Sequence, residues 1–288
     1  MDPIVDQELI ELDDSSTDEL TNMEIDLLLE GLYRWYGFDF RQYVRASLRR
    51  RVLNRMRLDR IPTVTALLNL VLHEPGYVDR LLGDFSIKVT EMFRDPSFFR
   101  AFRYNVVPQL RHLSEIRIWH AGCATGEEVY SMAILLQEEG LADRTKLYAT
   151  DMNEKAIEAA KRGAYPLKQM QTFTKNYLDS GGTNSFSEYY TTDHKQAYFD
   201  ASLREHVMFA QHNLVTDGSF NEFHVILCRN VLIYFDAALQ SQVHNLFHGS
   251  LSTGGFLGLG SKESILLLHH ASVYEEFVPT ERIYRKMR

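Results

Sequence analysis

The sequence predicts an α/β protein in which an all-helical N-terminal domain precedes a doubly wound parallel sheet that carries a small inserted β-subdomain. Two observations support this class. Apolar residues recur at helical spacing through about residue 107, and short apolar strands then alternate with helices from residue 116 onward. Such alternation is typical of parallel sheets. The chain has 288 residues, 45% of them hydrophobic, so it is long enough to build a real core.

The acidic residues concentrate at the N-terminus. The formal net charge is −8, from 31 Lys and Arg against 39 Asp and Glu. Residues 1–30 hold eleven acids and no Lys or Arg, which leaves 28 acids against 31 bases, or +3, in the rest of the chain. Because residues 1–20 are acidic and poor in apolar side chains, we expect them to form a mostly disordered tail.

Several helices are expected before the sheet, and residues 21–104 are assigned to the helical domain. Their expected positions are about 23–36, 40–58, 63–73, 75–83 and 95–107, with Gly37 placed to stop the first. The second is unusual because residues 41–60 contain eight arginines and one acid. The arginines are Arg41, Arg45, Arg49, Arg50, Arg51, Arg55, Arg57 and Arg60.

The predicted sheet domain spans residues 105–288. Strands are expected at 116–119, 146–150, 207–210, 224–228, 256–259 and 282–287, helices at 127–138, 154–162 and 236–250, and a turn at Gly254-Gly255. Residues 167–205 interrupt this alternation with Gly181-Gly182, several small polar residues and seven aromatics. We therefore expect them to form an inserted subdomain of short antiparallel strands.

The composition excludes several classes of protein. The N-terminus lacks the basic and apolar regions of a secretion signal, and no stretch approaches 18 uninterrupted apolar residues. We expect a soluble cytoplasmic protein without membrane insertion. The two cysteines, Cys123 and Cys228, allow neither a disulfide scaffold nor a CxxC metal site. The pair His269-His270 has no HExxH companion, so no metal is expected.

The strongest local motif is the small-residue turn Gly122–Gly126, which follows a strand and precedes a helix beginning with Glu127-Glu128. Such a turn lets the backbone approach a ligand at the carboxyl end of a strand. A dinucleotide site prefers GxGxxG and free helix amides for a pyrophosphate. Here the third glycine is missing and two carboxylates stand in that place. The motif therefore favours a nucleoside attached to a positively charged amino-acid group.

An acid at the end of the next strand extends this motif. Asp151 lies 25 residues after Gly126, and an acid at this position typically accepts hydrogen bonds from ribose hydroxyls. Together the turn and the acid indicate an S-adenosylmethionine site. The same local pattern also occurs by chance or as an ordinary helix N-cap, so by itself it is only moderately specific.

Longer segments resemble the CheR-type methyltransferases, the chemotaxis receptor glutamate O-methyltransferases. These segments are Tyr36–Tyr43, Ser47–Arg51, Val89–Pro96, Gly122–Tyr130, Ala149–Asp151 and Cys228–Phe235, in the family's order. The resemblance covers nearly everything from about residue 22 to residue 288. It implies a Rossmann-like methyltransferase sheet, S-adenosyl-L-methionine as cofactor, and glutamate side chains of the cytoplasmic domain of chemoreceptors as substrate.

The resemblance also implies roles for matching residues. Arg94 and Tyr234 would be catalytic and would position the carboxylate or the cofactor. The implied cofactor contacts are Thr90, Arg94, Gly122, Glu127, Glu128, Asp151, Asn213, Leu214, Arg229 and Asn230. Spacing does not decide which of Glu127 and Glu128 faces the cofactor. The chain departs from the family at Lys88, where Asn is usual, and at Met92, where Phe is usual, and Lys88 is left out of the site.

The arginine-rich helix has two interpretations. Charged helices are mostly solvated faces, but guanidinium groups suit carboxylate or phosphate partners. In the family's context the partner is an acidic receptor coiled coil, which Arg45, Arg49, Arg50, Arg51 and Arg55 would bind. Nucleic acid is the alternative. The chain lacks the Pro-Pro-aromatic motif of DNA amino-methyltransferases, which argues against base methylation but not against RNA binding as such. With the receptor as the expected partner, we expect no nucleic-acid partner. Residues 1–20 could also fold back on residues 41–60 and weaken receptor binding at low salt.

Two other functions stay open at this stage. The chain could methylate another protein carboxylate or a small molecule, or it could be a signalling module that binds cofactor or receptor without turnover. The insertion at 167–205 could capture a receptor peptide by strand addition, or its aromatics could simply form its own core. We expect the protein to be a monomer.

Overall fold

The computed structural model describes residues 14–85, 90–265 and 271–288, which divide by their contacts into two compact units, Met1–Phe85 and Ser86–Arg288. The helix α5, Pro96–Ala101, belongs to the second unit. The boundary expected at 104/105 would place this helix in the helical domain. The physical reason for the difference is that Phe98 and Phe99 are buried in the hydrophobic cluster of the sheet unit.

The first unit contains four helices in the described residues. They are α1 (Asp14–Tyr36), α2 (Arg45–Asp59), α3 (Val64–His73) and α4 (Tyr77–Phe85). The apolar side chains that predicted these helices form the core, because Leu28, Leu32, Leu48 and Val52 are at most 2% exposed. The prediction of helices in this region is therefore confirmed.

The expected disordered tail is wrong for residues 14–20, which belong to α1, while residues 1–13 lie outside the described part of the chain. Acids of α1 contact arginines of α2. Asp18 forms an ion pair with Arg49, and Asp26 lies 2.7 Å from Arg45. This agrees with the expected attraction between the acidic segment and the basic helix. Its effect on receptor binding stays a prediction.

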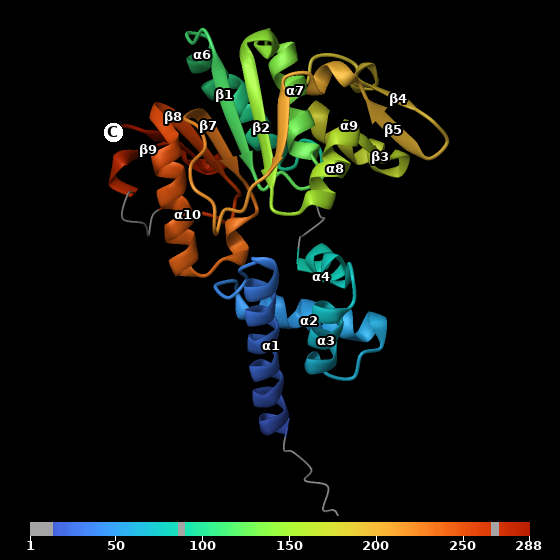
Figure 1. Cartoon of the computed structure of the whole chain (residues 1–288). Helices are drawn as coiled ribbons and strands as arrows, with labels where there is room; N and C mark the ends of the chain where they lie inside the picture. The colour runs from blue at the N-terminus through green and yellow to red at the C-terminus, as the bar shows by residue number, and fades with distance from the viewer. Residues whose placement is uncertain (1–13, 86–89, 266–270) are drawn as a thin grey trace, which may run out of the picture. The chain divides into compact units, whose positions relative to one another are not determined.

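The second unit is built on a seven-stranded sheet (Figure 1) in the order β6-β2-β1-β7-β8-β10-β9. The strands are β1 (Ile116–Ala121), β2 (Thr145–Asp151), β6 (Val207–Gln211), β7 (Phe223–Cys228), β8 (Leu251–Leu259), β9 (Tyr274–Val278) and β10 (Ile283–Lys286). The first five in this order pair in parallel, and β10 is antiparallel to both of its neighbours. The predicted doubly wound sheet is confirmed, with an antiparallel edge.

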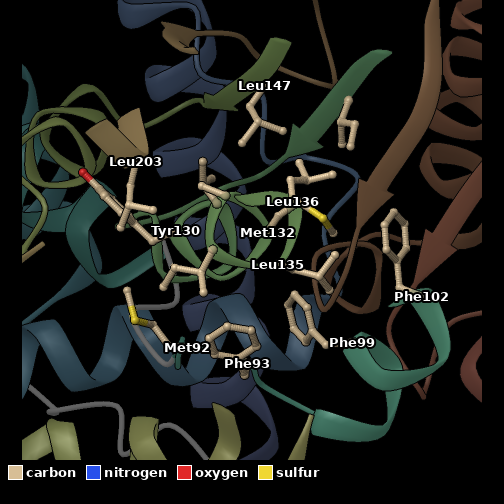
Figure 2. Close-up of a cluster of buried hydrophobic side chains, with 14 of the residues drawn as sticks. Met92, Phe93, Phe99, Phe102, Tyr130, Met132, Leu135, Leu136, Leu147 and Leu203 are labelled. Carbon is tan, nitrogen blue, oxygen red and sulfur yellow. The ribbon is translucent and has the colours of Figure 1, made fainter. Parts of the chain in front are cut away.

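Helices cover both faces of this sheet because successive strand residues point to opposite sides. The helices are α7 (Glu127–Glu138), α8 (Glu154–Arg162), α10 (Ala237–Ser250) and the short α6 (Val107–Leu110), which a π-helical turn at Phe102–Val106 joins to α5. Figure 2 shows the cluster on one face, where Phe99, Met132 and Leu147 are buried together. On the other face the Trp119 ring lies 5.5 Å from that of Phe247 in α10.

The inserted subdomain contains the expected short antiparallel strands. They are β3 (Ala164–Pro166), β4 (Tyr190–Thr192) and β5 (Gln196–Phe199), in the order β3-β5-β4. It also contains a helix that was not predicted, α9 (Met170–Asp179), which buries Phe173 and Tyr177. The turn expected at Gly254-Gly255 is wrong, since both residues lie inside β8, whose register with β7 shifts between Phe223 and Val225.

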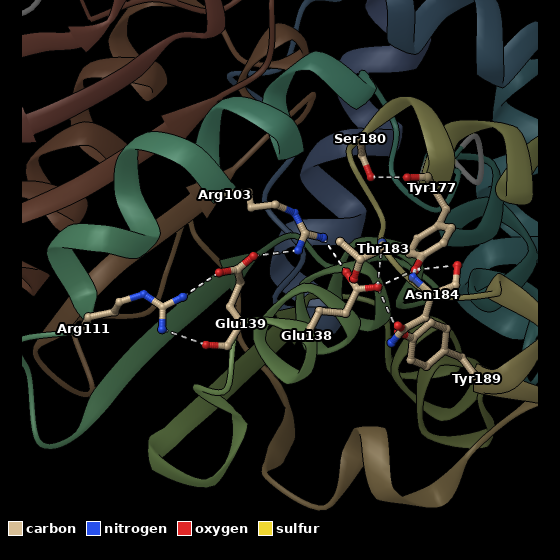
Figure 3. Close-up of polar contacts among 9 residues, drawn as sticks. All are labelled: Arg103, Arg111, Glu138, Glu139, Tyr177, Ser180, Thr183, Asn184 and Tyr189. Carbon is tan, nitrogen blue, oxygen red and sulfur yellow. Dashed lines mark hydrogen bonds and ion pairs between the residues drawn. The ribbon is translucent and has the colours of Figure 1, made fainter.

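A buried carboxylate joins α7 to the insertion (Figure 3). Glu138 forms a 2.5 Å ion pair with Arg103, and the side chains are 1% and 4% exposed. Its carboxylate also accepts hydrogen bonds from the hydroxyls of Tyr177 and Tyr189. Burial opposes ionisation, but the hydrogen bonds from Tyr177 and Arg103 hold the pKa of Glu138 below its usual range. The contact fixes the insertion on the sheet unit through charge as well as apolar packing.

We predict that Glu138→Ala lowers the free energy of unfolding by about 3 kcal/mol, because breaking a buried pair leaves a charge with less compensation. Urea denaturation measures this loss. The control is Arg111→Ala, which removes the 2.6 Å ion pair between Glu139 and an arginine that is 47% exposed. An exposed pair contributes at most about 1 kcal/mol. Equal losses in the two variants would contradict the interpretation.

Candidate functional site

The turn between β1 and α7 is held in a conformation that depends on glycine. Gly122 has φ +80°, and a Cβ there would lie 2.6 Å from Cγ2 of Val231. Gly126, the N-cap of α7, has φ +94°, and its Cβ would lie 2.9 Å from that of Ala160. These positions favour a residue without a side chain. The glycines therefore let the turn pack closely against Val231 and Ala160 at the carboxyl end of β1.

Asp151 lies at the carboxyl end of β2, beside this turn. Its Oδ2 accepts a hydrogen bond of 3.0 Å from the Ala124 amide, and its Oδ1 accepts one of 2.9 Å from the Asn153 amide. Burial raises the pKa of Asp151, and these backbone donors oppose the shift. A third backbone amide, that of Met152, also donates to this carboxylate. The carboxylate is thus fixed in direction, and since it has about four acceptor positions, three backbone donors leave room for a ligand hydroxyl.

The adjacent acids of α7 have different surroundings. Oε1 of Glu128 lies 3.0 Å from His120 Nδ1, and its Oε2 accepts a hydrogen bond of 3.0 Å from Arg229 Nη1. Burial opposes ionisation, but these two contacts hold the pKa of Glu128 below its usual value. The Glu127 carboxylate accepts hydrogen bonds from Thr125 Oγ1, and burial raises its pKa to about 7. Glu128 is therefore engaged by the protein, whereas Glu127 retains capacity for a cation.

Arg229, which follows β7, bridges three segments. One guanidinium nitrogen donates to Glu128, and the other donates to Asp95 Oδ2 at 2.8 Å and to the Arg94 carbonyl at 3.1 Å. The guanidinium also lies 4.1 Å from the centroid of the Phe98 ring. Its side chain is 2% exposed. The contacts of Asp95 and His120 were not predicted from the sequence: Asp95 lies in the Val89–Pro96 segment without an assigned role, and His120 is a single polar residue in a strand.

The remaining residues implied by the resemblance lie in turns. Arg94 stands between Phe93 and Asp95, which both have positive φ. Asn230 follows β7 with φ +61°, and Tyr234 ends a 3₁₀ turn at Leu232–Tyr234. Thr90 is half-buried, and Lys88 lies outside the described residues.

The turn after β6 adds two more of these residues. The amide of Asn213 donates to Asp217 Oδ2 at 2.8 Å, and its Oδ1 accepts from the amide of Val215 at 3.0 Å. Leu214 is buried. This turn is therefore fixed by its own side chains at the edge of the sheet where Asp151 ends β2.

The sheet order gathers these turns. Strands β6, β2, β1 and β7 are parallel neighbours, so Asn213, Asp151, Gly122 and Asn230 follow their carboxyl ends at one edge. The chain runs from β1 to β2 and β6 on one side and then crosses over to β7 on the other side of β1, and ligands of open α/β sheets bind where the strand order reverses in this way. The carboxylates of Glu127 and Asp151 beside the glycine turn fit a nucleoside that carries an ammonium group.

The described residues contain neither a metal site nor a membrane-spanning helix. No group of three or more His, Cys, Asp or Glu among them could hold a metal ion. Nor is any helix among them long and apolar enough to cross a membrane.

The pKa of Glu127 predicts a pH dependence that Glu127→Gln should remove. The pKa of about 7 in the folded chain exceeds the usual value of 4.5 for a glutamate side chain. Between these pH values the folded chain therefore binds more protons than the unfolded chain. Protonation of Glu127 stabilises the folded chain, and this stabilisation is lost as pH rises through the folded pKa. From about pH 5 to about pH 8, the variant should gain roughly 2 to 3 kcal/mol relative to wild type, since one pKa unit is about 1.4 kcal/mol.

Urea denaturation of both proteins at the two pH values measures this difference. A stability difference that is the same at both values would show that Glu127 titrates normally in the folded chain.

Comparison with known proteins places both units in one family. Residues 88–281 match the CheR methyltransferase SAM binding domain, and residues 23–86 match the CheR methyltransferase all-alpha domain. A Pseudomonas putida protein named "Putative methyltransferase Cher3" is 49% identical over 92% of this chain and 97% of its own length.

More distant relatives carry a functional name. A chemotaxis protein methyltransferase of Listeria monocytogenes is 28% identical over 80% of this chain and 86% of its own length. Chemotaxis protein methyltransferase 2 of Pseudomonas aeruginosa is 28% identical over 87% and 89%. The match of both units, in order, to one family shows that the chain belongs to the CheR methyltransferases and is an S-adenosylmethionine-dependent methyltransferase.

Proposed function

We propose that the protein transfers the methyl group of S-adenosylmethionine to glutamate side-chain carboxylates of chemotaxis receptors and forms methyl esters. The observation that carries this proposal is the match of both units to the CheR domains. Relatives that span most of the chain are named chemotaxis protein methyltransferases, which supports the substrate class.

The site suggests how the cofactor is held. Asp151 would accept from the ribose hydroxyls, and Glu127 would bind the ammonium group, since Glu128 is engaged by Arg229 and His120. The turn at Asn213 and Leu214 would border the adenine. Gly122, Asn230, Thr90 and Arg94 would complete the contacts. The cofactor supplies an electrophilic methyl group on a sulfonium.

Methyl transfer to a glutamate carboxylate requires the protein to orient the two reactants, but it does not require the protein to transfer a proton. A glutamate side chain has a pKa near ~4.3, so it is ionised at neutral pH and needs no general base. Orientation alone can lower a barrier by roughly 7 to 11 kcal/mol. We propose that Arg94 and Tyr234 position the substrate carboxylate. Arg229 would act on Arg94 indirectly, because it donates to the Arg94 carbonyl.

The contacts of α2 separate its arginines by role. Arg55 binds Asp84 through two nitrogens at 2.5 and 2.8 Å, and Arg51 donates to the carbonyl of Phe85, so both hold α4. Arg45 and Arg49 pair with acids of α1. Arg50 is exposed, and no ion pair is described for it in residues 14–85. We propose Arg50 as the main contact with an acidic receptor, assisted by Arg45 and Arg49.

The proposed reaction is tested by incubating the protein with S-adenosylmethionine labelled in the methyl group and with receptor-containing membranes, followed by mild alkali. We expect alkali-labile release of labelled methanol, which a carboxyl ester gives. Arg94→Ala should lose most of this release while it stays folded by circular dichroism. Alkali-stable label would indicate N-methylation, and cofactor binding without any label would indicate a non-catalytic module. Either result would refute the proposal.

The basic surface of α2 predicts a change in receptor binding. Arg50→Ala with Arg49→Ala should raise the KM for receptor by at least about threefold at low salt, and the effect should shrink at high salt because exposed charges are screened. The KM for S-adenosylmethionine should not change. The control removes the same charge from the sheet unit, with Lys146→Ala and Lys161→Ala. An equal rise in both double variants would show a general charge effect.

A further inference from the structure

Two turns at neighbouring strand ends converge on one buried carboxylate, that of Glu263. Its Oε2 accepts hydrogen bonds from the amides of Asn230 at 2.9 Å and Gly260 at 2.6 Å. Its Oε1 accepts from the amides of Val231 at 2.9 Å and Ile233 at 3.3 Å. Asn230, Val231 and Ile233 follow β7, whereas Gly260 follows β8. One side chain therefore holds both turns.

The surroundings of Glu263 suit a carboxylate and no other side chain. The residue is 5% exposed, and none of the ion pairs among the described residues includes it. A buried carboxylate without a cation is unfavourable unless hydrogen bonds satisfy it. A carboxylate has about four acceptor positions, and four backbone donors point at this one. A glutamine at this position would place an NH₂ group, which only donates, opposite some of these backbone donors.

The turn that Glu263 holds is under steric constraint. Asn230 has φ +61°, a conformation that costs a non-glycine residue energy unless the surroundings impose it. Val231 packs so closely on the loop after β1 that a Cβ on Gly122 would lie 2.6 Å from its Cγ2. On the other side, a Cβ on Gly260 would lie 2.8 Å from the Asn230 amide nitrogen. This turn is therefore packed closely against the loop after β1 on one side and against Gly260 on the other.

We propose that Glu263 is a positioning residue that fixes the Asn230–Tyr234 turn against the cofactor loop, so that both are set for S-adenosylmethionine. Glu263 itself does not contact the cofactor, since its acceptor positions are filled by backbone amides. The inference deepens the proposed function, because it rests on the roles proposed for Asn230 and Tyr234. Its test needs no receptor, so it can succeed or fail independently of the methyl-ester assay.

The test uses Glu263→Gln in the full chain, with S-adenosylhomocysteine as the probe. Calorimetry should show binding weaker by at least about tenfold, as for loss of a supporting contact in a preorganised site. Hydrogen exchange followed by mass spectrometry on peptides covering residues 229–235 should be faster in the unliganded variant. Glu263→Asp, which keeps the charge on a shorter side chain, should recover part of both properties. If Glu263→Gln does not fold, the same two measurements are made on Glu263→Asp.

A stability-matched control separates positioning from simple destabilisation. Val243→Ala creates a cavity under α10, where Val243 is fully buried, without touching the turn. It should lower the midpoint of thermal unfolding and leave the affinity for S-adenosylhomocysteine within about twofold of wild type. The proposal is overturned if folded Glu263→Gln keeps wild-type affinity and wild-type exchange in residues 229–235. It is also overturned if Val243→Ala weakens binding as much as Glu263→Gln.

Discussion

The site depends on the ion pair between Arg229 and Glu128. Arg229 follows a central strand, Glu128 lies in the first turn of α7, and both carry further partners, Asp95 and His120. A buried arginine is tolerated only where acids and carbonyls satisfy its donors. The two terminal guanidinium nitrogens of Arg229 meet this requirement, because they donate to the turn before α5 and to the first turn of α7, whereas its buried Nε has no hydrogen-bond partner among the described residues. Three segments that are far apart in sequence are thereby fixed in relation to each other.

This pairing also sets the charge of the cofactor site. Because the Arg229 guanidinium compensates Glu128, the uncompensated acids are Glu127 and Asp151, for which no ion pair is described in residues 14–85, 90–265 and 271–288. Burial raises the pKa of both. A site with two acids and little compensation is electrostatically suited to a cationic ligand. The sulfonium and ammonium of S-adenosylmethionine supply such charges, so ligand and site would neutralise each other.

The sequence predicted what depends on local periodicity, and it failed where long-range contacts decide. The helices of the first unit, the parallel strands and the glycine turn are visible in spacing, because burial on one face selects apolar residues at a fixed period. The helix α9 was missed because Phe173 and Tyr177 are buried against aromatics outside the helix, Tyr165 for the first and Phe93 and Phe186 for the second. The roles of Glu127 and Glu128 could not be separated, since these neighbours in sequence are distinguished by contacts with His120 in β1 and with Arg229, about a hundred residues away. Glu263 carried no motif, and its importance comes from the amides that surround it.

The close contact between Val231 and Gly122 has a consequence for recombination between relatives. A chimaera could take residues 116–126 from one parent and residues 228–235 from another. Its Gly122 turn would then pack against a side chain at position 231 that comes from the other parent. Since Cγ2 of Val231 occupies the place where a Cβ on Gly122 would lie, the two segments behave as one inheritable block. Crossover points that preserve activity should therefore fall outside this block, or should carry both segments and the residues 260–263 together.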